Sequence, residues 1–385
     1  MREMISLAVI LGLLCAQTQA ATTITRGSLA ARAYGFMKNK AVSSYTGPGD
    51  VVSTAKFWIG VRAYNAAYAA SAGKAANLRR ASDNTACDFN VATSGALGVS
   101  ASGCSAGSGL SPAAFATTDA TCTSGTAAAS TTLTLSGCSS TPHVGSSVAG
   151  SGFSQPVSVV SVGTFTSGAG TVTLNLPQTV SAVATTLTYG LFITEMYDQT
   201  GNGVNAIEST TALQPLLAPV CLNGLPCIDG SDGGVCLAAT ITAINQPVTI
   251  SAVAERVANF TSYAVTALGG FGTYFDATAN QVVQYYGATA TATATDGVAH
   301  TFEFSSNGTA TSFIMVDGSS TSGNPSTGSF PSASTIYFIG DNASCNSTYK
   351  MTMTEVGAWA SAFSSTQATN MCHNQRLYWG TGGSC

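Results

Sequence analysis

The chain has 385 residues, of which 13 are Lys or Arg and 17 are Asp or Glu, so that charged residues make up 8% of it. A net charge of −4 with 45% hydrophobic residues excludes disorder driven by charge, and the lack of a basic stripe argues against nucleic-acid binding. The polar residues are mostly Ser, Thr, Asn and Gly, a composition typical of an exported, loop-rich β protein.

Residues 1–20 have the pattern of a secretory signal peptide. Arg2 gives a positive start, residues 5–15 form an apolar stretch, and small residues precede a cleavage site after Ala20. The apolar stretch is shorter than the roughly 20 residues that cross a membrane, and no later stretch is long enough. We therefore expect a secreted protein, extracellular or periplasmic, without a membrane span.

Ten cysteines follow the signal, and an even number in an exported chain predicts disulfides. The pairs suggested by proximity in sequence are Cys87–Cys104, Cys122–Cys138 and Cys345–Cys372. The pairing of the other four stays open. Zinc is the alternative, but Cys221 and Cys227 are too far apart for a zinc knuckle, so we expect no metal.

The N-terminal third of the chain has one strong helical pattern. Residues 21–56 are polar and poorly patterned, whereas apolar residues from Phe57 to Tyr68 recur at helical spacing in an Ala-rich run without Pro. This pattern predicts a helix over residues 57–80, packed against the rest of the protein. A Gly-, Ser- and Ala-rich stretch then follows to residue 123.

Residues 124–190 contain no Lys, Arg, Asp or Glu. Four short β-like runs, separated by Gly, Ser and Pro, occur at residues 131–135, 157–162, 171–176 and 186–189. We interpret this block as a small all-β insert that folds on itself. A long low-complexity loop is the alternative.

The chain beyond residue 190 predicts one strand after another, about 10 residues apart, which is the spacing of a β-sandwich. These strands are predicted at 191–197, 236–243, 247–254, 261–266, 271–275, 281–286, 299–305, 311–316, 335–340 and 349–356. A helix is predicted at 364–378, with a start signal at Ser364-Ser-Thr-Gln367. We divide the chain into a signal (1–20), an N-terminal segment (21–56), one sandwich domain (57–123 with 191–385) and the insert (124–190).

The sequence Tyr197-Asp198-Gln199-Thr200-Gly201-Asn202-Gly203 follows the apolar strand at 191–196. By its residues it is a strand end that runs into a tight turn. Gly201 and Gly203 permit positive φ, while Asp198 and Asn202 can bond backbone amides. A turn-making role therefore explains the segment without any further function.

The same segment resembles the YDQSGNG signature of the arabinofuranosidase B catalytic domain and its secreted bacterial relatives in the concanavalin A-like (laminin G-like) superfamily. Residues 78–84, 207–215, 355–359 and 374–379 resemble other segments of that family. The resemblance covers residues 57–123 and 191–380. It implies an all-β, concanavalin A-like jelly-roll sandwich, here with a short N-terminal helix and a small all-β insert, and a glycan or polysaccharide as partner.

That family cleaves terminal arabinofuranose with retention, which requires two carboxyl groups about 5–5.5 Å apart. Its general acid is an Asp in a GGDN-like turn after an apolar strand. Gly340-Asp341-Asn342 matches this turn, so the resemblance implies Asp341 as the acid, with Gly340 and Asn342 beside the sugar. A plain hairpin turn is the alternative.

The family's nucleophile is a Glu in an apolar-D-x-E-N segment, and the best counterpart is Phe275-Asp276-Ala-Thr-Ala-Asn280. Asp276 and Asn280 match the sugar-binding positions, but no Glu lies between them, and the family's vicinal cysteines are also absent. The resemblance gives no catalytic role to the other carboxylates that follow the signature: Glu208, Asp229, Asp232, Glu255, Asp296, Glu303, Asp317 and Glu355. Without a nucleophile the covalent route is closed, so the nucleophile stays unidentified and full catalytic competence is not expected.

Three functions compete. The first is a secreted glycan-binding or adhesion protein with a degenerate active site. The second is an active α-L-arabinofuranosidase-like hydrolase, and the third is a structural protein of a cell surface or phage-like particle.

Residues 229–234 resemble part of a calcium loop without its closing Glu, so calcium is a minor option and no other cofactor is expected. Tyr274, Tyr285, Tyr286 and Trp359 could stack on sugar rings, but a role in the hydrophobic core is the expected one for each of them.

Overall fold

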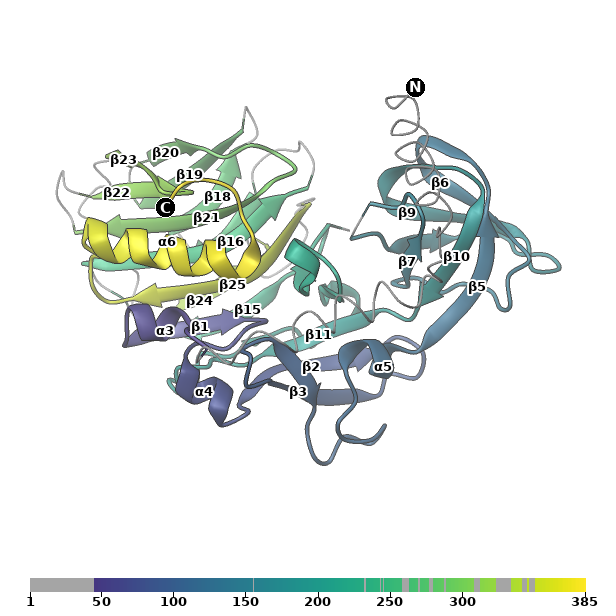
Figure 1. Ribbon diagram of the computed structural model, residues 1–385, viewed down its shortest axis with the longest axis horizontal. Helices are drawn as coiled ribbons and strands as arrows, with labels where there is room; N and C mark the ends of the chain where they lie inside the picture. The colour runs from purple at the N-terminus through teal and green to yellow at the C-terminus, as the bar shows by residue number, and fades with distance from the viewer. Residues whose placement is uncertain are drawn as a thin grey trace, which may run out of the picture. The chain divides into compact units, whose positions relative to one another are not determined.

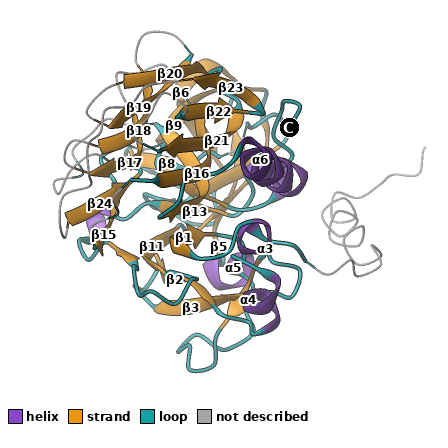
Figure 2. Cartoon of the chain, turned by 90° about the vertical axis from the view of Figure 1, so that its left-hand side faces the viewer, coloured by secondary structure: helices purple, strands orange, loops and turns teal. Residues whose placement is uncertain are grey.

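The computed structural model describes residues 45–154, 156–231, 233–242, 244, 246–257, 263–268, 271–276, 280–286, 289–307, 312–322, 334–340, 345 and 350–385. Within these residues the strands form two hydrogen-bonded sheets, of 19 and six strands, and adjacent strands are antiparallel (Figures 1 and 2). The protein is therefore all-β, as predicted. None of its described helices is both long and apolar enough to span a bilayer.

The larger sheet folds into two layers. Layer A consists of β23 (Ser319–Ser322), β22 (Phe313–Val316), β21 (Ala299–Ser306), β16 (Val248–Arg256), β25 (Met351–Trp359) and β1 (Ala55–Gly60). Layer B consists of β20 (Thr289–Thr293), β19 (Gln281–Tyr286), β18 (Phe271–Asp276), β17 (Tyr263–Leu268), β24 (Ser334–Phe338), β15 (Leu237–Ile241), β12 (Ala206–Ile207), β11 (Leu191–Met196), β2 (Lys74–Arg80), β3 (Ala86–Val91) and β4 (Leu97–Ser100). β13 (Leu216–Ala218) and β14 (Cys227–Asp229) join the layers, because β13 pairs with β11 and β14 with β25.

The hydrophobic core lies between the two layers. Phe57 of layer A meets Phe338 of layer B with ring centroids 5.7 Å apart, and Phe302 meets Phe275 at 5.4 Å. All four side chains are at most 2% exposed. The architecture is thus a β-sandwich, in which the inward-facing residues of both layers exclude water together. The ten strands predicted beyond residue 190 all overlap observed strands.

Helix α6 (Ser365–Trp379) covers the outer face of layer A, as Figures 1 and 2 show. It begins with the predicted signal, because Ser364 and Gln367 form a capping box, and it ends at Gly380 with a φ of 68°. Gln375 Nε2 donates to Ser251 Oγ of β16 at 2.9 Å. Since layer A is covered on both faces, β21 and β25 are buried along their whole length.

The insert forms a sheet with its own core. Its strand order is β7-β10-β5-β6-β9-β8, with bounds β5 (Thr118–Ser124), β6 (Ala127–Ser136), β7 (Ser147–Gly150), β8 (Val159–Val162), β9 (Gly170–Val180) and β10 (Val183–Thr188). Val148 N donates to Val157 O at 2.9 Å and Val159 N donates to Ser146 O at 2.9 Å, which joins the two outer strands and closes a small barrel. The six strands therefore fold on themselves, but their sheet begins at Thr118, before the predicted start at residue 124. Closure removes the free sheet edges that invite aggregation.

The predicted helix over 57–80 is wrong in most of its length. This region contains β1, the short helix α4 (Ala66–Ala70) and β2, and another short helix, α3 (Pro48–Val51), precedes it. Phe57 and Trp58 are both fully buried on opposite faces of β1, because the interior of the sandwich lies on one side and α6 on the other. Two adjacent apolar residues imitate helical spacing there. The short N-terminal helix exists, but as one or two turns between strands.

Five disulfides form among the described residues. Cys87–Cys104 and Cys122–Cys138 are confirmed, whereas the predicted Cys345–Cys372 pair is wrong. The observed partners are Cys236–Cys345, Cys372–Cys385 and Cys221–Cys227. Cys236 immediately precedes β15, which pairs with β24, so sheet pairing brings together cysteines 109 residues apart.

Candidate functional site

The turn that follows β11 uses its two most polar side chains to hold the backbone of a distant segment. Asp198 Oδ1 accepts a hydrogen bond from Trp58 N at 3.0 Å. Gln199 Oε1 accepts from Tyr64 N at 2.7 Å, and its Nε2 donates to Gly60 O at 2.9 Å. Asp198 and Gln199 are both buried. These side chains therefore secure the end of β1, which is a structural task.

The remaining signature residues also serve the turn. Tyr197 donates its hydroxyl proton to Asp88 Oδ1 at 2.6 Å, and burial together with this carboxylate raises the pKa of Tyr197. The Lys74 ammonium lies 5.2 Å from the centre of the Tyr197 ring. Gly201 and Gly203 have φ values of 86° and 76°, which side chains disfavour. The signature thus explains the local fold without a reacting group.

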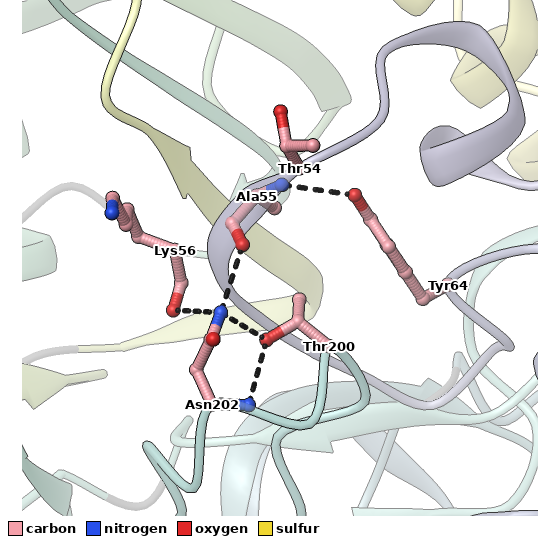
Figure 3. Close-up of a pocket in the computed structure, with 6 residues that line it drawn as sticks. All are labelled: Thr54, Ala55, Lys56, Tyr64, Thr200 and Asn202. Atoms are coloured by element: carbon pink, nitrogen blue, oxygen red, sulfur yellow. Dashed lines mark hydrogen bonds between the residues drawn. The ribbon is translucent and has the colours of Figure 1, made fainter.

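A pocket of about 290 Å³ lies beside the turn, as Figure 3 shows. Its lining consists of Thr54, Ala55, Lys56, Tyr64, Thr200 and Asn202. Asn202 Nδ2 donates to Ala55 O at 3.0 Å and to Lys56 O at 3.1 Å. No carboxylate is among these six residues, so the pocket lacks the acid and base that glycoside cleavage requires.

Three segments meet at one edge of layer B. The strands β12, β24 and β18 run parallel to one another, because β15 and β17 lie between them and pair antiparallel with both neighbours. Their carboxyl-terminal ends therefore share an edge. We call this place the edge site and define it by Glu208, Gly340 and Asp276, which follow or end these strands. Gly340 lies two strands from each of the others, or about 10 Å at backbone level.

The backbone at the end of β24 is strained. Ile339 is buried and has a φ of 62°, a rare conformation for a β-branched residue, and such strain is concentrated at functional sites. Its side chain occupies space that Gly230 leaves open, since a Cβ at Gly230 would lie 2.2 Å from Ile339 Cγ2. A Cβ on Gly340 would lie 2.6 Å from Cys236 Cβ, so only glycine fits at this position beside the disulfide.

Glu208 lies against the same disulfide. Its Oε1 accepts from Thr210 N at 2.6 Å, and its Oε2 is 3.6 Å from Cys345 Sγ. The carboxylate and the sulfurs of Cys236 and Cys345 lie within 4.8 Å of one another, but sulfurs bonded to each other are not metal ligands of the thiolate kind. A disulfide has no proton to donate, so Oε2 has no hydrogen-bond donor among the described residues.

The other predicted site residues lie as follows. Asp341 and Asn342 are outside the described residues, and of Asp276 the structure describes the backbone at the end of β18. Asn280 is exposed and has a φ of 50°, and its Oδ1 accepts from Asp296 N at 3.0 Å. Asn280 therefore orders the neighbouring turn.

The aromatic candidates separate by position. Trp359 is fully buried and donates from Nε1 to Val52 O at 3.0 Å, so it has the expected core role and does not stack on a sugar. Tyr274 lies on β18, and Tyr285 and Tyr286 lie on the neighbouring strand β19; the side chains of these three residues are outside the described part of the structure. Sequence reasoning had no signal for the relation between Glu208 and Gly340, because it depends on sheet order.

Comparisons with protein families and with curated proteins found no match for this sequence. Among solved structures, a GH54 α-L-arabinofuranosidase soaked with a cyclic sulfate inhibitor is 14% identical with a TM-score of 0.48, and the match covers 86% of this chain and 64% of that one. Trypanosoma rangeli sialidase in complex with sialic acid is 14% identical with a TM-score of 0.37, over 48% and 31% of the two chains. The binding domain of Paraclostridial Mosquitocidal Protein 1 is 12% identical with a TM-score of 0.37, over 48% and 52%. The chain thus spans less than two thirds of each of these structures.

Proposed function

We propose that this chain is an exported, carbohydrate-directed β-sandwich protein that binds a glycan at the edge site without cleaving it. The observation that carries the proposal is the register of β24, β17 and β18. This register brings the end of β24, where the GDN-like turn begins, to the same edge as Asp276. Gly340 and Asp276, which are 64 residues apart in sequence and which the family resemblance both singles out, thus follow or end strands at one edge, with β17 between those strands.

Binding is favoured over hydrolysis because the second catalytic carboxyl group has no counterpart where the resemblance requires it. Retaining hydrolysis needs two carboxyl groups about 5–5.5 Å apart. The position where the resemblance requires the nucleophile holds no Glu, because Ala277, Thr278 and Ala279 stand between Asp276 and Asn280. Asp341 remains our candidate for an acid, with Gly340 and Asn342 beside the sugar.

Export is supported by the disulfides. Five of them occur among the described residues, and disulfides persist in oxidising compartments such as the periplasm and the extracellular space. A signal peptide over residues 1–20 would direct the chain there and would be cleaved off after Ala20. N-terminal sequencing of the protein secreted by its host tests this cleavage directly.

Two assays on the full chain test the function. We expect binding on an array of plant and bacterial glycans, and no release of 4-nitrophenol from 4-nitrophenyl α-L-arabinofuranoside. Release that Asp341→Asn abolishes would overturn the non-catalytic proposal and establish the hydrolase. Silence in both assays, with multimers on size-exclusion chromatography, would favour the structural role.

A further inference from the structure

We propose that Glu208 is a residue of the edge site that accepts hydrogen bonds from the hydroxyl groups of a neutral saccharide. This assignment rests on the proposed function and names the ligand class and a contact residue for it. Glu208 lies in the 207–215 segment that resembles the family, but the resemblance gives it no binding or catalytic role. The inference comes from the order of strands in layer B and from the surroundings of one carboxylate.

The first argument is position. Glu208 directly follows β12, and Ile207 pairs with Ala238 of β15, which in turn pairs with Tyr337 of β24. The same row continues from Tyr337 to Ala267 of β17. Glu208 therefore leaves the sheet at the same edge as Gly340, on the opposite side of β24 from Asp276.

The second argument is an unused acceptor. Glu208 is half-buried, and its Oε1 is held by Thr210 N at 2.6 Å, so the carboxylate is fixed in direction. Its Oε2 meets only the sulfur of the Cys236–Cys345 disulfide among the described residues. A carboxylate oxygen in this state is a strong acceptor for hydroxyl donors, since hydrogen bonds to charged groups contribute more than neutral ones.

The third argument is rigidity. The Cys236–Cys345 disulfide lies between Glu208 and Gly340, and the absence of a side chain on Gly340 lets β24 approach Cys236 closely. The side chain of Ile339 packs against the backbone of Gly230, where a larger residue would not fit. A binding group that a disulfide and a packed turn already hold in place loses little conformational entropy when a ligand binds. This preorganisation raises the affinity for the ligand.

The charges at this edge select the ligand class. Glu208 is acidic, whereas two cations on neighbouring segments are engaged: Arg256 pairs with Asp296, and Lys350 Nζ donates to Asn175 O at 3.1 Å. An anionic sugar such as a uronate or a sialate would meet the Glu208 carboxylate, and neither of these two cations is free to receive it. The hydroxyl groups of a neutral saccharide can donate hydrogen bonds to Glu208.

The test measures binding by the full, oxidised chain to two sets of probes. Neutral probes are arabino- and xylo-oligosaccharides, and anionic probes are oligogalacturonides and sialyllactose. Glu208→Gln keeps an oxygen for Thr210 N but removes the charged acceptor, so we expect about 10- to 150-fold weaker binding to the neutral probe. Asp83→Asn removes the same charge from an exposed carboxylate on the β2–β3 turn and should bind like the wild type. An unchanged unfolding midpoint for Glu208→Gln shows that the fold is intact.

The outcomes separate the two proposals. If the wild type binds neutral glycans and Glu208→Gln binds them equally well, the assignment of Glu208 is wrong while the proposed function stands. If the wild type prefers the anionic probes, the charge argument fails. If the wild type neither binds nor cleaves any glycan, the proposed function itself is overturned, and the role of Glu208 with it.

Discussion

Glu303 gives the sharpest test of the structure. It lies on β21 beneath α6, is fully buried, and neither of its carboxyl oxygens has a hydrogen-bond partner among the described residues. Its cross-strand neighbour Ser251 is bonded to Gln375 of α6, whose Oε1 also lacks a donor. Burial, with Asp317 and Glu355 nearby, raises the pKa of Glu303 well above its usual value. We therefore expect a neutral carboxylic acid at pH 7.

The perturbation is Glu303→Gln, which keeps the shape and removes the titration. Above a pH of about 4.3 the unfolded wild type releases this proton while the folded protein keeps it, so wild-type stability falls as pH rises towards the folded pKa. The loss is about 1.4 kcal/mol per pH unit in this window. The stability advantage of Glu303→Gln over the wild type should thus grow between pH 5 and pH 7, by at most about 2.7 kcal/mol, the limit for a group that stays protonated in the folded state throughout.

Urea unfolding at pH 5, 6 and 7, with the disulfides intact, measures this difference. Asp83→Asn is the matched control, because the hydrogen bond from Arg80 lowers the pKa of Asp83, and this carboxylate is ionised in both states across the window. Its difference from the wild type should be constant. A constant or shrinking difference for Glu303→Gln would refute the claim that the buried carboxyl group keeps its proton.

Two further predictions concern the signature turn and the edge site. Asp198→Ala leaves the buried amide of Trp58 without its acceptor and should lower the free energy of unfolding, measured in urea, by about 3 kcal/mol. The control Asp83→Ala should change this free energy little. Equal losses in the two variants would contradict the structural role of the turn. Gly340→Ala forces a methyl group against Cys236 and should lower the free energy of unfolding by about 1–3 kcal/mol. Gly382→Ala should be nearly neutral, because no atom lies within 4 Å of its added methyl group. Thermal unfolding of both variants tests this, and equal melting temperatures would argue against the close approach of β24 to the disulfide.

The strands beyond residue 190 were predictable because each carries its own local signal. Strand residues alternate or form short apolar runs between turn residues, and α6 begins at a capping box that four adjacent residues encode. The charge-free block at 124–190 likewise predicted its own all-β character. In each case the information lies within about ten neighbouring residues.

The helix over 57–80 and the Cys345–Cys372 pair failed for a related reason. Phe57 and Trp58 are adjacent and both buried, a pattern that only makes sense once α6 is known to cover the outer face of layer A. Proximity in sequence placed Cys345 with the wrong partner, because the pairing of β15 with β24 joins residues 109 apart. Both errors come from contacts that no local pattern records.

The sequence alone predicted the all-β class, the β strands between residues 124 and 190, the terminal helix and the presence of disulfides, since these depend on composition and local spacing. The tertiary structure decided what the polar residues do. In the folded protein, the signature turn holds β1 by hydrogen bonds, and Trp359 is buried. Glu208 lies beside the disulfide at the end of β24. Strand order in a sheet sets such neighbours, and strand order follows from packing the whole core rather than from any one segment.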